Sequence, residues 1–262
     1  MLGAVIGDIV GSRFEWKNTK SKDFELFMPE CHITDDSVMT LAIARAILNC
    51  VGQPEELGNE AVRCMQAFGR RWARGCYGGS FARWLLSDEP RPYGSWGNGS
   101  AMRVSACAWA APSLEEALDM ARIVTEVTHD HPEGIKGALA VTAAIWLALK
   151  GAGKAEIREH IEANYYQLDF TLDEIRPSYG FDVSCQGSVP QAIVAFLEAV
   201  SFEDTVRNAI SLGGDSDTIG AMAGSMAEAF YGIPSDLRER ALAYLEPDLR
   251  EVVIKFEASY SG

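Results

Sequence analysis

Apolar residues recur at helical spacing along most of the chain. In residues 37–51 the apolar positions, Val38, Leu41, Ala42 and Ile47 among them, are separated by intervals that place them on one face of a helix. The same spacing predicts helices over residues 54–75, 113–128, 131–151, 187–200, 201–214, 217–232 and 235–245. Alternation typical of a strand is almost absent, and residues 166–172 (YQLDFTL) are its best candidate.

Local signals mark several helix ends. Ser113 and Glu116 have the spacing of a capping box, and Pro132 suits the first turn of a helix that stops at Gly151. Gly75 is expected to end the helix that begins at residue 54. No linker or repeat interrupts the pattern. We therefore predict an all-α fold, a single compact multi-helix orthogonal bundle of ten or more helices formed by residues 1–262.

The N-terminal segment predicts one unusually close helix contact. Gly3, Gly7 and Gly11 recur every four residues, so they share a helix face that lets another backbone approach. Asp8 interrupts this segment, and Glu15 follows two helical turns later. The alternative is a tightly packed helix with Glu15 exposed to solvent.

Composition and charge exclude several classes of function. The 262 residues are 48% hydrophobic, and 23 basic against 37 acidic residues leave a net charge of -14. This charge repels phosphate backbones and anionic lipid, so we expect no stable nucleic-acid partner and no membrane. An anionic small molecule would need a local source of positive potential. The six cysteines form no C-x-x-C pair, and residues 1–17 lack a basic region before the apolar run. Reduced thiols and a cytoplasmic location are expected.

Two short segments concentrate carboxylates ahead of apolar helices. They are TDDS, which begins at Thr34, and GGDSDT, which ends at Thr218. Each alone fits an ordinary helix N-cap, but a cap needs only one oxygen. Together the segments supply four carboxylates, and each pair about 4 Å apart would repel by roughly 4 kcal/mol. Such a cluster must take up protons or bind cations. Oxygen ligands without His or Cys favour Mg²⁺ or Mn²⁺, and bridging carboxylates suit two such ions.

Five separated motifs together resemble the ADP-ribosylglycohydrolase family. They are GAVIGDIVGS with Glu15, TDDSVMTLA, GNGSAMRVS, THDHPEGIKGA and GGDSDTIGAMAGSMAEAFYG, and they occur in the order expected for the family. The resemblance covers nearly the whole chain and implies an all-helical fold that binds two Mg²⁺ (or Mn²⁺) ions. It implies metal ligands at Thr34, Asp35, Asp36, Asp215, Asp217 and Thr218. Among these, Asp35 and Asp217 would act with Glu15 as catalytic carboxylates, and Asp8 would support the ligands.

The implied activity is hydrolysis of the glycosidic bond at the distal ribose C1 of ADP-ribosyl conjugates, which releases ADP-ribose. Cleavage there passes through an oxocarbenium-like transition state. A metal pair can lower the pKa of a bound water, and a nearby carboxylate can assist proton transfer. Two alternatives remain. The same site could hydrolyse a smaller ribosyl or phosphoribosyl conjugate, as short loops between helices suggest. The chain could also be a non-catalytic relative that binds ADP-ribose.

Three further segments are candidates for contacts with the substrate. The glycine-rich stretch GSWGNGSAMR offers Asn98, Gly99 and Ser100, with Met102 packing nearby, although an ordinary capping loop is the alternative. The family resemblance favours His129 near the diphosphate or distal ribose. A helix start capped by Asp130 is the alternative there. The ring of Tyr77 could stack on a substrate ring or be buried between helices.

Overall fold

The computed structural model describes residues 1–72 and 75–260. These residues form fourteen α-helices and two short 3₁₀ helices, and they contain no β-strand. The prediction of an all-α fold is confirmed. The elements are α1 (Leu2–Gly11), α2 (Asp35–Asn49), η1 (Pro54–Glu56), α3 (Leu57–Arg71), α4 (Gly79–Leu86), η2 (Asn98–Ser100), α5 (Ser105–Ala110), α6 (Leu114–Glu126), α7 (Pro132–Leu149), α8 (Lys154–Asn164), α9 (Leu172–Ile175), α10 (Cys185–Glu198), α11 (Phe202–Ser211), α12 (Ser216–Tyr231), α13 (Ser235–Tyr244) and α14 (Pro247–Tyr260).

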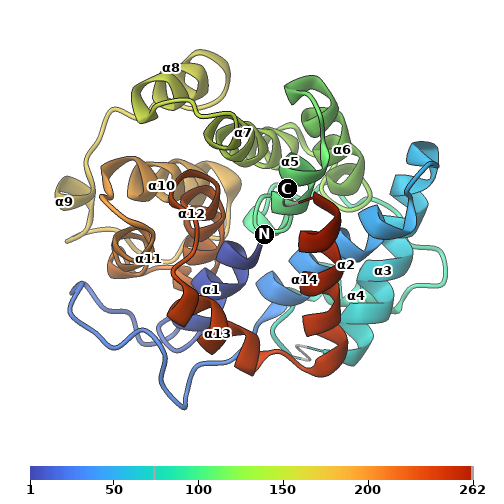
Figure 1. Cartoon of the computed structure of the whole chain (residues 1–262), viewed down its shortest axis with the longest axis horizontal. Coiled ribbons are helices and arrows are strands. Elements are labelled where there is room, and N and C mark those ends of the chain that lie inside the picture. Colours follow the sequence, from blue (N-terminus) through green and yellow to red (C-terminus); the bar gives the residue numbers. More distant parts are fainter. Residues whose placement is uncertain (73–74, 261–262) are drawn as a thin grey trace.

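Helices α1 and α12 lie side by side near the centre of the molecule, with α2, α7, α10 and α11 around them (Figure 1). Every residue of α1 is buried. Helix α7 is long and apolar enough to cross a membrane, by length and composition only. It packs against α5, α6, α8, α10 and α12, as expected for a core helix.

The glycine face predicted for the N-terminal segment is the contact between α1 and α12. A Cβ atom added to Gly7 would lie 1.9 Å from the carbonyl oxygen of Gly220, and one added to Gly3 would lie 2.2 Å from that of Gly224. A Cβ on Gly11 would lie 2.5 Å from the Cα of Asp217. The two helices are therefore antiparallel and in backbone contact, which brings Asp8 on α1 beside the start of α12.

Several predicted helix boundaries need correction. The strand expected over residues 166–172 is absent, because no other described segment pairs with it, and Leu172 begins α9. The helix expected over residues 54–75 is divided into η1 and α3. It ends at Arg71, where Trp72 is extended (φ -117°, ψ 164°), and residues 73–74 lie outside the described part of the chain. The Ser113 hydroxyl caps α6 by accepting from the Glu116 N–H at 3.2 Å, but it donates to the Glu116 carboxylate, so the reciprocal half of the capping box is missing.

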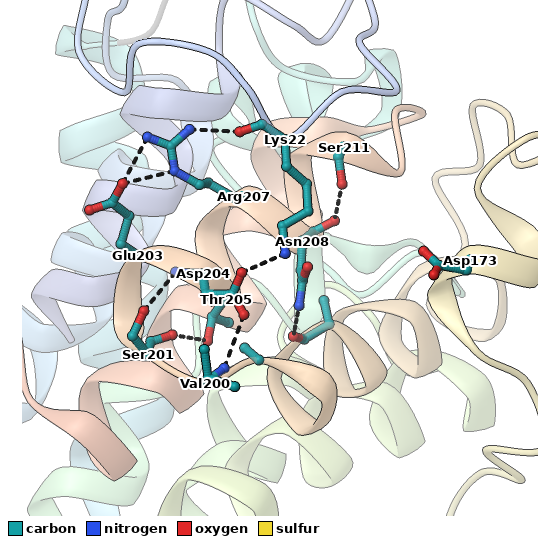
Figure 2. Close-up of polar contacts among 12 residues, drawn as sticks. Lys22, Asp173, Val200, Ser201, Glu203, Asp204, Thr205, Arg207, Asn208 and Ser211 are labelled. Atoms are coloured by element: carbon teal, nitrogen blue, oxygen red, sulfur yellow. Dashed lines mark hydrogen bonds and ion pairs between the residues drawn. The ribbon is translucent and has the colours of Figure 1, made fainter.

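The long loop between α1 and α2, which carries Glu15, is fastened to α11. The Arg207 guanidinium donates to the carbonyl oxygens of Lys22 and Phe24, each at 2.7 Å, while it also bonds Glu203 on its own helix. Figure 2 shows the bonds of Arg207 to Lys22 and Glu203 and the ion pair between Lys22 and Asp204. These contacts hold residues 22–24 of the loop against α11.

Candidate metal centre and ligand cavity

The two acidic segments predicted from the sequence form the N-terminal ends of α2 and α12, and these ends meet. The Thr218 hydroxyl on α12 donates to Oδ2 of Asp36 at 3.1 Å, and the Thr34 hydroxyl lies 3.3 Å from the same oxygen. Asp36, Asp217 and both threonines are at most 6% exposed. One buried carboxylate therefore lies against hydroxyl groups from the starts of both helices.

Helix capping accounts for only part of this arrangement. Thr34 is the N-cap of α2, and its hydroxyl accepts from the N–H of Asp36. Asp215 is at the N-cap position of α12 but makes no capping hydrogen bond; its Oδ2 accepts from the Asn98 amide at 2.7 Å instead. Oδ1 of Asp36 is buried without a hydrogen-bond partner among the described residues. An unpaired buried carboxylate oxygen is costly, and a bound cation would satisfy it.

The carboxylates form two overlapping groups, each able to hold a cation. Oxygens of Asp8, Asp36 and Asp217 lie within 4.8 Å of one another, and so do oxygens of Glu15, Asp215 and Asp217. Asp217 belongs to both groups, which is the arrangement expected of a carboxylate between two neighbouring ions. Only oxygen donors are present in these groups, so the residues fit hard divalent cations better than zinc.

Burial and mutual repulsion disfavour the charged forms of these groups. Burial, followed by the charges of Asp36 and Asp215, holds the pKa of Asp217 well above its ordinary value. Burial and the charge of Asp8 raise the pKa of Asp35 to about 8. The pKa of Glu15 is also raised, by burial and by Asp215. Without cations the cluster therefore retains protons near neutral pH, and bound cations would displace them.

Asp8 links α1 to the start of α2. Its carboxylate accepts from the N–H of Thr34 at 3.0 Å, from the Thr34 hydroxyl at 2.7 Å and from the N–H of Ser37 at 3.0 Å. The sequence predicts that Asp8 supports the metal ligands, and this position orients Thr34. Asp8 also belongs to the carboxylate group with Asp36 and Asp217, which places it within reach of a cation.

The glycine pair before Asp215 forms a sharp turn. Gly213 and Gly214 have φ values of 71° and 70°, which side chains other than glycine rarely adopt. The Asn18 amide closes the turn, since it donates to the carbonyl oxygen of Gly214 at 3.0 Å and accepts from its N–H at 2.8 Å. The turn thereby ties the loop that carries Glu15 to the start of α12.

A cavity of about 530 Å³ opens over the carboxylates. Most of the predicted site residues line it. They are Glu15, Asp35, Asp36, Tyr77, Asn98, Gly99, Met102, His129, Asp215, Asp217 and Thr218. Tyr77 faces the cavity with its ring near that of Phe81, at 5.4 Å between centroids, and its hydroxyl donates to the Trp72 carbonyl oxygen.

Two predicted substrate contacts have other partners. The Asn98 amide is bonded to Asp215, so it orients a carboxylate. The hydroxyl of Ser100 is fully buried and donates to the carbonyl oxygen of Gly134 at 2.8 Å, with that of Gly97 3.1 Å away, and the side chain does not line the cavity. Both side chains belong to η2, a turn that packs its polar side chains inward. The sequence pattern alone did not reveal in which direction these two side chains point.

Among the cavity residues without a predicted role, three have unusual exposure or burial. Trp16 and Phe181 are 77% and 49% exposed and stack at the cavity edge, with ring centroids 5.4 Å apart. Trp16 directly follows Glu15, and a tryptophan beside a candidate catalytic residue was a usable signal in the sequence. Arg103 is completely buried below the cavity. An arginine within the apolar stretch 101–108 was also a signal.

Comparisons with known proteins agree with this geometry. A family model described as ADP-ribosylglycohydrolase matches residues 1–260. The chain is 27% identical to human ADP-ribosylhydrolase ARH3, over 95% of this chain and 90% of the relative. It is 25% identical to ADP-ribosyl-[dinitrogen reductase] glycohydrolase of Rhodospirillum rubrum, over 96% of this chain and 92% of the relative. A solved ADP-ribosylglycohydrolase-related protein complex has a TM-score of 0.72 at 23% identity, covers 99% and 95% of the two chains, and supports the fold.

Proposed function

The chain belongs to the ADP-ribosylglycohydrolase family, and on that premise we propose that it is a divalent-metal-dependent hydrolase. Its reaction would cleave the glycosidic bond at the distal ribose C1 of an ADP-ribosyl conjugate and release ADP-ribose. The observation that carries this proposal is the pair of carboxylate groups that share Asp217 beneath a ligand-sized cavity. A cavity of about 530 Å³ is within the range that small-molecule sites occupy.

Two Mg²⁺ or Mn²⁺ ions are the proposed cofactors. Thr34, Asp35 and Asp36 would hold them from α2, and Asp215, Asp217 and Thr218 from α12. When bound, the ions supply positive charge that orients the vicinal hydroxyls of a ribose and lowers the pKa of a coordinated water. The two protein relatives carry ADP-ribosyl hydrolase names, which supports the same class of substrate for this chain.

Glu15 is the proposed proton-transfer group. It is half-buried at the cavity wall, and its carboxylate is within 4.8 Å of oxygens of Asp215 and Asp217. Its raised pKa brings it closer to neutrality, where a general base can accept a proton from water and later return it. Asn18 and the ion pair of Lys22 restrain the loop that carries it. The reaction therefore needs little rearrangement of this residue.

A hydrolysis screen across distinct linkages tests the proposal. Purified protein with Mg²⁺ or Mn²⁺ would be incubated with ADP-ribosyl-arginine, ADP-ribosyl-serine, O-acetyl-ADP-ribose and simple ribosides. Release of ADP-ribose from at least one conjugate, lost in EDTA and in Asp217→Asn, is the expected result. Turnover only of compounds that lack the adenylate would replace this function with hydrolysis of smaller ribosyl conjugates. Binding of ADP-ribose without turnover of any conjugate would make the chain a non-catalytic relative.

A further inference from the structure

Arg103 is a buried cation without a carboxylate partner. Its side chain is 0% exposed, and its guanidinium donates to the carbonyl oxygens of Gly99 (3.1 Å) and Val124 (3.0 Å) and to the Thr128 hydroxyl (2.7 Å). Within residues 1–72 and 75–260, no ion pair reaches it and its Nε has no hydrogen-bond partner. Burial of a charge away from water without an ion-pair partner costs free energy, so we expect Arg103 to have a role that offsets this cost.

The Thr128 hydroxyl connects this cation to His129. Its oxygen lies 2.7 Å from Nδ1 of His129 and already accepts a hydrogen bond from Arg103. The hydroxyl has one proton to donate, and the other acceptor within reach, the carbonyl oxygen of Thr125, is 3.4 Å away. The shorter contact takes the proton, and the bond from Arg103 makes the hydroxyl a stronger donor. Nδ1 is therefore the acceptor, so a neutral imidazole carries its proton on Nε2.

Nε2 of His129 faces the glycine-rich loop at the cavity wall. A Cβ added to Gly99 would lie 3.4 Å from this nitrogen, and one added to Gly97 would lie 3.6 Å from it. The ring of Tyr93 lies near that of His129, with 5.8 Å between the centroids. No hydrogen bond from another described residue occupies Nε2, although the side chain is only 5% exposed and lines the cavity.

We propose that Arg103 and Thr128 are positioning residues that hold His129 neutral with its proton on Nε2, so that the cavity presents a fixed hydrogen-bond donor to a phosphate oxygen of its ligand. Burial and the charge of Arg103 also lower the pKa of His129 well below its ordinary value. The donor therefore does not depend on protonation of the ring. The identity of the ligand, but not the state of the ring, rests on the proposed function.

A phosphate group is the ligand chemistry that this arrangement favours. The cavity is also lined by carboxylates, which would repel an anion. The buried charge of Arg103 and the Nε2–H donor supply positive potential within the same cavity. The protein as a whole has a net charge of -14, so such a local source is required for any anionic ligand.

The protonation state can be measured without any turnover. Nitrogen-15 NMR of the four histidines in the full chain, with His129 assigned by its loss in His129→Gln, reports which ring nitrogen carries the proton. We expect a pyrrole-type Nε2 and an acceptor-type Nδ1, and a changed Nδ1 resonance in Thr128→Val that Thr128→Ser restores. A proton on Nδ1 in the wild-type protein would overturn the proposal. An unchanged Nδ1 resonance in Thr128→Val would overturn it as well.

Binding measurements test the consequence for the ligand. His129→Leu removes the donor and should weaken ADP-ribose binding at least tenfold, which is the size expected for a hydrogen bond to a charged group. His129→Gln keeps an amide donor and should stay within about threefold of wild type. Adenosine, which has no phosphate, should bind both variants alike. An equal loss for adenosine would contradict a phosphate contact.

A matched pair separates positioning from general stability. Thr128→Val should weaken ADP-ribose binding about tenfold, whereas Thr142→Val should not, because the buried Thr142 hydroxyl bonds only the Ala138 carbonyl oxygen within α7. Equal affinities for the two variants would refute the positioning role. If wild-type protein does not bind ADP-ribose, both the proposed function and the ligand assignment fail. The NMR result then still decides the state of the ring.

Discussion

The contact between α1 and α12 predicts a large effect from one added methyl group. In Gly7→Ala the new Cβ would lie 1.9 Å from the Gly220 carbonyl oxygen. An ordinary carbon–oxygen contact is about 3.4 Å, so the helices must separate locally by about 1.5 Å. Overpacking of this kind costs about 1–3 kcal/mol of unfolding free energy. Asp8 follows Gly7 directly, so the same shift moves its carboxylate away from Asp217 and should weaken metal binding.

Urea denaturation and calorimetric titration with Mn²⁺ measure both effects. Gly58→Ala in α3 is the matched control, because its Cβ would meet only Cγ2 of Ile123, at the ordinary distance of 3.5 Å. The control should be neutral or stabilising by up to about 1 kcal/mol, since alanine is the better helix former. If Gly7→Ala were as stable as the control and bound Mn²⁺ equally well, the close helix contact would not organise the site as described.

Three further predictions concern the site itself. Without metal, the unfolding free energy should fall as the pH rises from about 4 to about 8, because the folded protein raises the pKa of Asp35 to about 8 and so binds more protons than the unfolded chain. Urea denaturation in EDTA measures this, and a free energy of unfolding that rises over the same range would contradict it. Asp217→Asn removes the carboxylate that the two carboxylate groups share, so calorimetry should detect loss of Mn²⁺ binding while circular dichroism shows unchanged helical content. Wild-type affinity of this variant for Mn²⁺ would exclude Asp217 as a ligand. Trp16→Ala removes one ring of the exposed stack with Phe181 beside Glu15, so steady-state kinetics should show kcat/KM for a conjugate reduced about two- to tenfold, with unchanged affinity for ADP-ribose. An equal loss of ADP-ribose affinity would mean that the stack contacts the ADP-ribosyl group instead of the leaving group.

The fold class and the two carboxylate-rich helix starts were predictable because local sequence determines them. Helical spacing of apolar residues gave the helix-rich class, and the glycines at positions 3, 7 and 11 indicated the close contact that the structure shows with Gly220 and Gly224. Asp36 and Asp217 each stand at a helix start in a segment with more carboxylates than a cap requires, and the family resemblance implied that the two segments share a metal site. The structure brings them together with Asp8.

Other features depended on contacts that sequence spacing does not encode. The directions of Asn98 and Ser100 follow from how η2 packs against Asp215 and Gly134. The link from Arg103 to His129 joins two segments 26 residues apart through the hydroxyl of Thr128. The strand expected over residues 166–172 is absent because a strand needs a neighbouring strand to pair with. The sequence of one segment does not show whether such a partner exists.

We propose above all that the starts of α2 and α12 hold a pair of divalent cations. Anomalous X-ray scattering from crystals grown with Mn²⁺ tests it most directly. We predict two manganese peaks about 3.5–4 Å apart, between residues 34–36 and residues 215–218, with a carboxylate oxygen of Asp217 beside both. Absence of manganese from this position in well-ordered crystals, or a single ion bound elsewhere, would contradict the account.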